Sequence, residues 1–212
     1  MKVLAETAGD LPGMNGQNCG SLRERKHERV LREIECAAWE LFAAVGFDGA
    51  TVEAISRQAG ISRRTFFRYF QSKEDLLSYS ITQCGQRVVS RFAAQPTRQA
   101  PLAALERAIL ATAREEMGKP QPRIAVMMTS PPLRGRFLYH LNEWVPLLAE
   151  ELVRRRAYRG NRSRCELAAA LYCTAFDRAH TCWLKAQDTD LQTLLKRAFH
   201  QLGNIKGLRP GR

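Results

Sequence analysis

The chain has 212 residues, enough for one large domain or two small ones. Its formal net charge is +12 and its isoelectric point is about 9.9, an excess that favours anionic partners such as nucleic acid. The sequence contains no apolar run of roughly 18 residues, so no membrane span is predicted. Residues 1–21 lack the apolar core of a signal peptide. We therefore expect a cytoplasmic protein whose residues 1–21 form a disordered leader.

The cysteines do not follow the pattern of a disulfide framework or of a zinc site. There are six of them, none in a CxxC pair, and no pair of histidines has the spacing of metal ligands. Reduced thiols buried as small apolar residues are the expected state. A redox pair of Cys173 and Cys182 remains an open alternative. No metal or cofactor is implied.

The first predicted helix runs from about residue 22 to residue 45. Its apolar positions fall within about 120° of one another on a helical wheel, and Gly46 is expected to end it. The members of this apolar stripe are Val30, Leu31, Ile34, Ala38, Leu41, Phe42 and Val45. Cations crowd its first turns, which is the unfavourable end for positive charge in the field of the helix. A basic arm that reaches DNA and plain solubility are both open explanations.

Two short helices and a longer one follow, each with a good capping residue. Thr51, Ser62 and Ser72 are the predicted N-caps, and Ala59-Gly60 separates the first two helices. Two short helices joined by a tight turn containing glycine are typical of the helix-turn-helix motif, whose second helix enters the major groove of DNA.

The second short helix has one apolar face and one basic face. On a helical wheel Phe66 and Phe70 point inward with Tyr69 beside them, whereas Arg64 and Arg68 lie one turn apart on the opposite side. Five cations and no acid occur between Arg57 and Lys73. Although such a cluster can be only a solvated face, within this motif it favours contact with phosphates and base edges.

The remaining sequence, 73–212, is expected to be entirely helical, because no strand alternation and no internal repeat occurs. The predicted helices cover about 73–94, 101–117, 123–129, 133–156, 163–186 and 188–202, and 204–212 form a basic tail. Ser163 is the expected cap of the fifth of these helices. Six arginines cluster at 154–164; a solvated loop and an anion site are both open there.

The pattern of residues across 25–77 resembles the TetR family of bacterial transcriptional regulators. The matching positions are Phe42, Gly46, Phe47, Thr51, Val52, Ile55, Ala59-Gly60-Ile61-Ser62, Thr65, Phe70 and Ser72-Lys73-Glu74. The resemblance implies an all-α fold with an N-terminal three-helix helix-turn-helix DNA-binding domain at 22–72. A larger helical domain for ligand binding and dimerisation would cover 73–203.

The resemblance also implies which residues contact DNA. Thr51 falls at the start of the helix before the recognition helix, and Lys73 resembles the family's phosphate-contacting lysine. The recognition helix would carry Ser62, Arg63, Arg64, Thr65, Phe67, Arg68 and Tyr69. Phe67 replaces a usual tyrosine, so its phosphate hydrogen bond is lost, whereas Arg64 replaces a small residue and adds a base or phosphate contact.

The second domain is expected to hold a ligand pocket and a dimer interface. A set rich in Met, aromatic and polar-tipped residues suits an adaptable apolar cavity: Met127, Met128, Phe137, Leu141, Trp144, Cys173, Phe176, His180 and Trp183. Small and apolar residues of the last two helices would pair across a two-fold axis as a four-helix interface: Ala168, Tyr172, Ala175, Ala179, Leu194, Leu195, Ala198 and Leu202. Packing within one chain is the alternative for both sets.

The expected function is that of a DNA-binding homodimer, most simply a repressor that a small apolar or amphipathic effector releases from a palindromic operator. The chain has no nucleophile elbow, phosphate-binding loop or HExxH motif, so no enzyme is expected. A protein–protein adaptor without DNA, and a DNA-binding protein without an effector, remain the alternatives.

Overall fold

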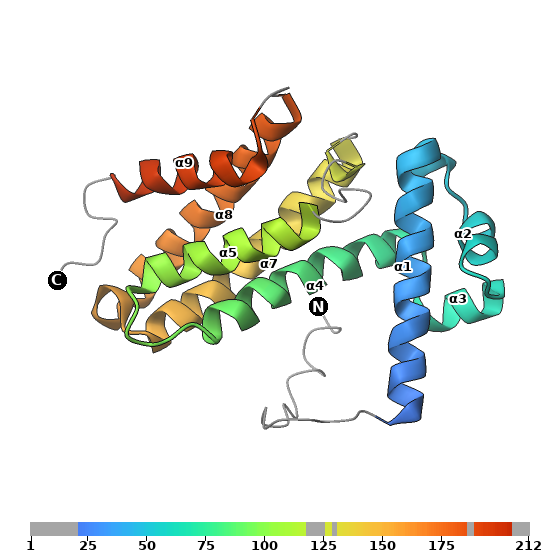
Figure 1. The fold of residues 1–212 in the computed structure, drawn as a ribbon, viewed down its shortest axis with the longest axis horizontal. Helices are drawn as coiled ribbons and strands as arrows, with labels where there is room; N and C mark the ends of the chain where they lie inside the picture. Colours follow the sequence, from blue (N-terminus) through green and yellow to red (C-terminus); the bar gives the residue numbers. More distant parts are fainter. Residues whose placement is uncertain (1–20, 118–125, 129–130, 186–188, 205–212) are drawn as a thin grey trace.

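The computed structural model of the protein describes residues 21–117, 126–128, 131–185 and 189–204, and within these ranges it contains helices and no strand. The all-α prediction is therefore confirmed for the described part of the chain. Figure 1 shows two parts: helices α1 to α3 form one end of the molecule, and α4 runs from them into a larger bundle.

Helix α1 spans Leu22–Gly49 and begins with a complete capping box. The Ser21 hydroxyl accepts a hydrogen bond from the backbone N–H of Glu24 at 3.2 Å, and the Glu24 carboxylate accepts one from the N–H of Ser21 at 2.7 Å. Gly46 has φ 77° and interrupts the helical geometry where the helix is expected to end, but α1 continues to Gly49. A residue with a Cβ would be strained at this φ.

Helices α2 (Val52–Gln58) and α3 (Arg63–Tyr69) form the predicted helix-turn-helix. Thr51 accepts a hydrogen bond from the N–H of Ala54 at 3.1 Å, and Ser62 accepts one from the N–H of Thr65 at 3.0 Å, so both predicted caps are confirmed. Gly60 makes the turn between them at φ 66°.

The first three helices enclose a small apolar core. Phe66 and Ile55 have no exposed surface, and Phe42 and Phe70 are almost fully buried. Burying an aromatic side chain of this kind stabilises a fold by about 1.5–3 kcal/mol. The inner face of α3 is therefore held firmly, and this anchoring fixes which of its side chains face outward.

The second part of the molecule is a bundle of longer helices. Helix α4 spans Lys73–Ala93, α5 Pro101–Met117, α7 Pro131–Arg154, α8 Arg162–Lys185 and α9 Leu191–Gly203, with a short 3-10 turn η1 at Ala157–Gly160. Helix α8 packs against α7 and α9, and α4 packs against α5 and α7. Most of the expected short helix at 123–129 lies outside the described residues.

In the bundle, the predicted starts of α4 after Ser72 and of α5 at residue 101 are confirmed, whereas α7, α8 and α9 begin at other residues than predicted. The side chains of Ser72 and Asp190 cap α4 and α9. Helix α8 instead begins one residue before Ser163, and its first turn is capped by Asn161, whose side-chain oxygen accepts from the N–H of Arg164 at 3.0 Å. Helix α7 begins at Pro131, two residues before the predicted start at 133, in agreement with the preference of proline for first-turn positions.

Of the six arginines at 154–164, Arg155 alone has a buried side chain, and the other five are exposed. Arg155 is buried; it donates to the main-chain carbonyls of Phe92 at 2.6 Å and Gln95 at 2.7 Å and so closes the C-terminal end of α4. Glu151 accepts from both Arg154 and Arg155 at 2.7 Å. Arg155 thus joins α7 to α4, and the exposure of the other five arginines agrees with the alternative of a solvated loop.

Candidate functional site

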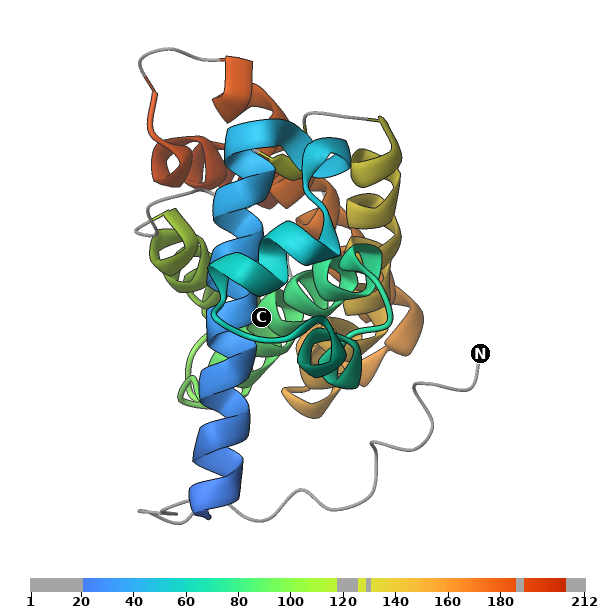
Figure 2. The ribbon, with the colours of Figure 1, turned by 90° about the vertical axis from the view of Figure 1, so that its right-hand side faces the viewer.

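The outer face of α3 is exposed and basic, as the helical wheel predicts. Arg64 and Arg68 are exposed, and Phe67 keeps 47% of its surface accessible between them. Arg64 has no ion-pair partner within the described ranges. Arg63, in contrast, forms an ion pair with Glu53 of α2, with 2.9 Å between the guanidinium nitrogen and the carboxylate oxygen. Figure 2 views the molecule from this side, with α2 and α3 in front of α1.

The predicted DNA-facing residues Tyr69 and Lys73 contact α1 in the structure. The Tyr69 ring is half-buried and stacks on the ring of His27 from α1, with centroids 4.7 Å apart. Lys73 directs its ammonium group at three main-chain carbonyls at the end of α1: Phe47 at 2.7 Å, Asp48 at 3.3 Å and Ala50 at 3.0 Å. An ammonium has three donor hydrogens, so these contacts occupy them all. In this structure Lys73 therefore joins α1 to α4, and its phosphate contact stays a prediction.

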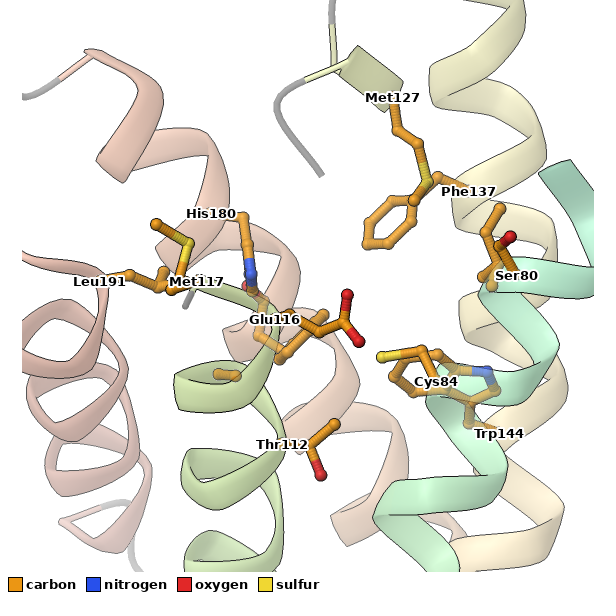
Figure 3. A pocket seen from close by; sticks show the side chains of 13 residues that line it. Ser80, Cys84, Thr112, Glu116, Met117, Met127, Phe137, Trp144, His180 and Leu191 are labelled. Carbon is orange, nitrogen blue, oxygen red and sulfur yellow. The ribbon is translucent and has the colours of Figure 1, made fainter. Parts of the chain in front are cut away.

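The bundle encloses a cavity of about 40 Å³, room for no more than a few water molecules. Its lining comes from four long helices, α9 and the segment before α7 (Figure 3). The complete lining is Ser80, Ile81, Cys84, Thr112, Ala113, Glu116, Met117, Met127, Phe137, Trp144, Phe176, His180 and Leu191.

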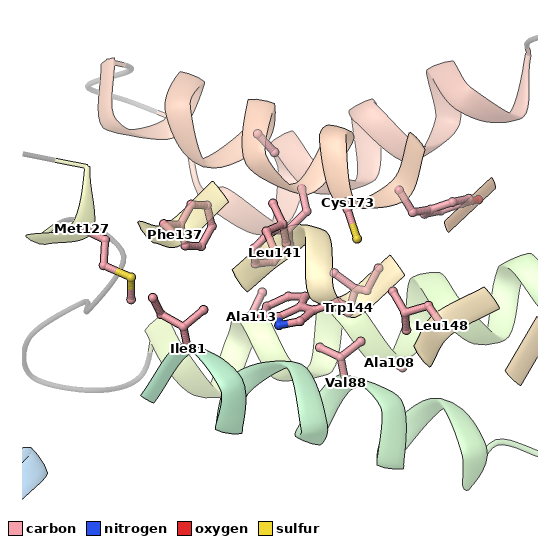
Figure 4. Close-up of a cluster of buried hydrophobic side chains, with 14 of the residues drawn as sticks. Ile81, Val88, Ala108, Ala113, Met127, Phe137, Leu141, Trp144, Leu148 and Cys173 are labelled. Carbon is pink, nitrogen blue, oxygen red and sulfur yellow. The ribbon is translucent and has the colours of Figure 1, made fainter. Parts of the chain in front are cut away.

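Five of the nine residues expected in a ligand pocket meet at this cavity: Met127, Phe137, Trp144, Phe176 and His180. The other four are core or near-core residues elsewhere. Leu141 and Cys173 belong to the buried apolar cluster drawn in Figure 4. They also line a separate groove of about 260 Å³ between α7 and α8. Met128 and Trp183 pack against the core without reaching the cavity.

The sequence reasoning missed the walls contributed by α4 and α5. Ser80 and Cys84 of α4 and Thr112 and Glu116 of α5 interrupt the apolar stripes of their helices. A polar residue on a stripe that faces the core is the signal that could have identified them, since a buried polar group needs a partner or a function.

Several polar groups of the cavity are held by partners in the fold, whereas the buried indole N–H of Trp144 has no hydrogen-bond partner among the described residues. His180 is buried; its Nδ1 lies 2.8 Å from the Phe176 carbonyl, and burial lowers its pKa from 6.5 to about 4. The imidazole is therefore neutral at pH 7, and its Nδ1–H donates to the carbonyl. Glu116 forms an ion pair with Arg87 of α4. Outside this cavity, burial raises the pKa of the Cys173 thiol to about 12, so this thiol is unreactive.

Ser80, which lines the cavity, is also hydrogen-bonded to α1 in the DNA-binding part of the molecule. The Ser80 hydroxyl donates to the Glu35 carboxylate at 2.6 Å and accepts from the Trp39 indole N–H at 3.3 Å. Both partners belong to α1, and Ser80 and Trp39 are buried. A movement of α4 at the cavity therefore changes a polar contact with α1 directly.

The predicted dimer interface needs correction for five of its eight residues. Ala168, Tyr172, Ala175, Ala179 and Leu195 are already buried within the single chain, because α8 lies between α7 and α9. The Tyr172 hydroxyl donates to Glu106 of α5 at 2.5 Å. The half-buried Leu194, Ala198 and Leu202 keep surface available, and Leu167 of α8, which was not predicted, is 60% exposed.

Other site classes find no support in the described residues. Cys36, Cys84, Cys165, Cys173 and Cys182 form no disulfide, and Cys36 and Cys182 are exposed, against the expectation of uniformly buried thiols. No group of metal-ligating side chains gathers within the same part of the chain. None of its helices is long and apolar enough to cross a membrane.

An exposed basic second helix on a buried helix-turn-helix core defines a DNA-binding protein with a separate helical domain. Residues 36–79 match the model of the bacterial regulatory proteins of the tetR family, and residues 87–206, more than half of the chain, match the model of the MftR C-terminal domain. The chain therefore belongs to the TetR family of transcriptional regulators.

Individual relatives agree with this assignment. The chain is 26% identical over 186 residues to the putative mycofactocin biosynthesis transcriptional regulator MftR of Mycobacterium tuberculosis, covering 84% of this chain and 92% of that one. It is 34% identical over 101 residues to the HTH-type transcriptional regulator TcmR of Streptomyces glaucescens, a match that spans 46% of this chain and only 45% of the relative. Both relatives are named as transcriptional regulators.

Solved structures show the same fold. The fatty acid degradation regulator FadR of Bacillus halodurans superimposes with a TM-score of 0.62 at 21% identity, over 84% of this chain and 96% of that one. A TetR-family regulator of Syntrophomonas wolfei gives 0.66 at 12% identity, over 82% and 93%.

Proposed function

We propose that the protein is a homodimeric repressor that binds a palindromic operator through α3 and leaves it when a small apolar or amphipathic molecule enters the bundle. Residues 22–72 would be the DNA-binding domain and 73–203 the effector and dimerisation domain. The main support for DNA binding is that α3 has one buried apolar face and one exposed basic face. Phe66 is buried, whereas Arg64 and Arg68 are exposed.

Arg64 is the strongest candidate for reading bases. It is exposed near the start of α3 and, unlike Arg63, has no ion pair with a described residue to compete with DNA. Arginine is the commonest reader of guanine, through O6 and N7 in the major groove. Arg68 lies one turn further on, and Thr65 is on the same outer side. These residues form the proposed reading face.

Two arguments support dimerisation. TetR-family regulators act as dimers, and the recognition helix of a single chain is too short to recognise a specific site. A seven-residue helix covers too few bases for a specific site, and two-fold half-sites require two copies. After the correction above, the face open to a second copy combines Leu167 and Leu171 of α8 with Leu194, Ala198 and Leu202 of α9.

The cavity supports an effector role in part. Aromatic rings and the flexible side chains of Met117 and Met127 form walls that can adapt to a guest, and Ser80 links the cavity to α1. Because about 40 Å³ is too small for a typical effector, the bound state must be wider than this one. A ligand that prefers the wider state would shift α4 and, through it, the spacing of the two α3 helices.

The same narrow cavity favours a second candidate function, a regulator that binds DNA without an effector. In that case the bundle is simply a dimerisation domain whose core is almost filled. A ligand screen decides between the two: a compound that raises the melting temperature and releases operator DNA supports the first, and binding by no compound supports the second.

The DNA-binding part is tested by selecting duplexes from a random pool with the wild type and with Arg64→Ala in parallel. Loss of a base contact should cost about 1–3 kcal/mol and relax the preference at one position of each half-site. Arg107→Ala, an exposed arginine of α5 in the other domain, is the charge-matched control and should leave the selected sequence unchanged. An unchanged preference in Arg64→Ala would remove Arg64 from the reading face.

A further inference from the structure

The charge around the cavity is unbalanced. Among the described residues that line it, Glu116 is the only acid, and none is a lysine or an arginine. Figure 3 shows the Glu116 carboxylate pointing from α5 into the space, toward Cys84 of α4. His180 adds no charge at pH 7, because burial lowers its pKa to about 4. The described walls therefore present negative charge and no positive charge to a guest.

The apolar part of the lining is largely aromatic. Phe176 packs against Phe137 and against Trp144, with ring centroids 6.5 Å and 5.8 Å apart, so the three rings form one continuous wall. The face of an aromatic ring attracts cations as well as apolar groups. A carboxylate beside an aromatic wall therefore suits a molecule with an apolar body and a positively charged group.

The partner of Glu116 in the fold is Arg87 of α4, which is not among the residues that line the cavity. The Arg87 side chain keeps 31% of its surface exposed, against 19% for Glu116. The Nε of Arg87 is buried and has no hydrogen-bond partner among the described residues. Because this N–H would gain a water partner if the guanidinium turned outward, Arg87 releases Glu116 at a lower cost than a fully bonded arginine would.

Arg87 is one of two arginines that join α4 to α5. One turn further along α4, Arg91 donates to Thr112 of α5 at 2.9 Å and forms an ion pair with Glu115. Loss of the Arg87 contact alone would free the part of α4 nearer to the DNA-binding domain, while Arg91 still holds the other end. That freed part carries Ser80, whose hydroxyl donates to Glu35 of α1.

We propose that the effector is a cationic amphiphile, an apolar molecule with one ammonium group that replaces the Arg87 guanidinium at the Glu116 carboxylate. This proposal rests on the proposed effector role of the cavity and names the chemical class of the effector. The ammonium group donates to the carboxylate, the apolar body lies against the aromatic wall, and Arg87 turns to solvent. Effector binding is thereby coupled to the release of α4 from α5.

Three probes that share a phenyl ring and a four-carbon chain test the charge preference: phenylbutylamine, phenylbutanol and phenylbutyrate. Their affinities for the full chain are measured by isothermal titration calorimetry at pH 7, together with the rise in melting temperature. The amine should bind about tenfold more tightly than the alcohol, and the butyrate should bind most weakly. Tenfold is the lower end of the range for a hydrogen bond to a charged group, because Arg87 competes for the same carboxylate.

Three variants locate the preference, and circular dichroism shows whether each keeps its helix content. Glu116→Gln should abolish the preference for the amine over the alcohol. Glu115→Gln is the matched control and should retain it, because this change removes the same charge and an ion pair with α4 but lies outside the cavity lining. Arg87→Gln removes the competitor and should strengthen amine binding, which a purely structural role of the ion pair does not predict.

The possible results separate this proposal from the effector role itself. Equal binding of the amine and the alcohol, tightest binding of the butyrate, or equal losses in Glu116→Gln and Glu115→Gln would overturn the proposal while leaving an effector role in place. If Glu116→Gln does not fold, Arg87→Gln decides, since unchanged or weaker amine binding contradicts the proposal. Binding of none of the probes would also overturn it, and the effector role would then depend on the ligand screen described above.

Discussion

The contact of α4 with α7 at the cavity depends on the absence of one side chain. A Cβ added to Gly85 of α4 would lie 2.5 Å from Cδ1 and from Cε2 of the Trp144 indole. Carbon atoms in contact normally lie about 3.5–4.0 Å apart, so the ring and the helix would have to separate by about 1 Å. Trp144 cannot move easily because it is buried and packs on Phe176, with ring centroids 5.8 Å apart.

The expected cost of Gly85→Ala follows from two opposing effects. Alanine is favoured over glycine in a helix by about 1 kcal/mol, whereas overpacking a core costs about 1–3 kcal/mol. Gly135 of α7 separates the two effects, because a Cβ there meets nothing within 4 Å. Gly135→Ala should stabilise the protein, and Gly85→Ala should be less stable than it by about 2 kcal/mol.

Urea unfolding of the two glycine variants and of their combinations with Trp144→Phe measures this difference. The smaller phenyl ring removes the atoms that the new methyl group meets, so the Gly85→Ala penalty should shrink in that background. If Gly85→Ala and Gly135→Ala change stability alike, or if the penalty is the same with Phe at 144, the described packing of α4 on α7 is wrong.

Three further outcomes are expected. Lys73→Met should destabilise the protein by about 1.5–3 kcal/mol in urea unfolding, since three carbonyls lose a charged donor; unchanged stability with a flatter salt slope of DNA binding would support the phosphate contact instead. Ser80→Ala should lower stability by about 1–3 kcal/mol and speed exchange of the Trp39 indole proton in NMR; unaltered exchange would contradict the contact with α1. The unfolded chain binds a proton on His180 near pH 6.5 and the folded chain only near pH 4, so stability should fall by about 3 kcal/mol as pH drops through this window. His180→Gln should lack this component, and superimposable pH profiles for the two proteins would refute it.

The local features of the fold were predictable from the sequence because local chemistry determines them. Caps at Thr51, Ser62 and Ser72 need only a hydroxyl three residues ahead of an unpaired N–H. Gly46 stands where φ is 77°, a conformation that few other residues adopt. The inward position of Phe66 follows from helical periodicity alone.

The contacts between distant segments were not predictable in the same way. An apolar stripe shows that a helix face is covered, but it does not show whether another part of the chain or a second copy covers it; Tyr172 and Leu195 were assigned to the dimer for this reason. Similarly, the cavity walls from α4 and α5 required the three-dimensional arrangement. The carbonyls that surround the Lys73 ammonium lie 23 to 26 residues earlier in the chain, beyond any sequence motif.

The central claim, a dimeric protein that reads a palindromic sequence through α3, is tested most directly by selecting bound duplexes from a random pool with the full chain. We expect an enriched palindrome whose half-site centres are separated by about one helical turn of DNA or a multiple of it, bound by two protomers with an affinity that falls steeply with salt. Absence of enrichment at every salt concentration, or binding that is insensitive to salt, would contradict the claim and favour a protein–protein adaptor.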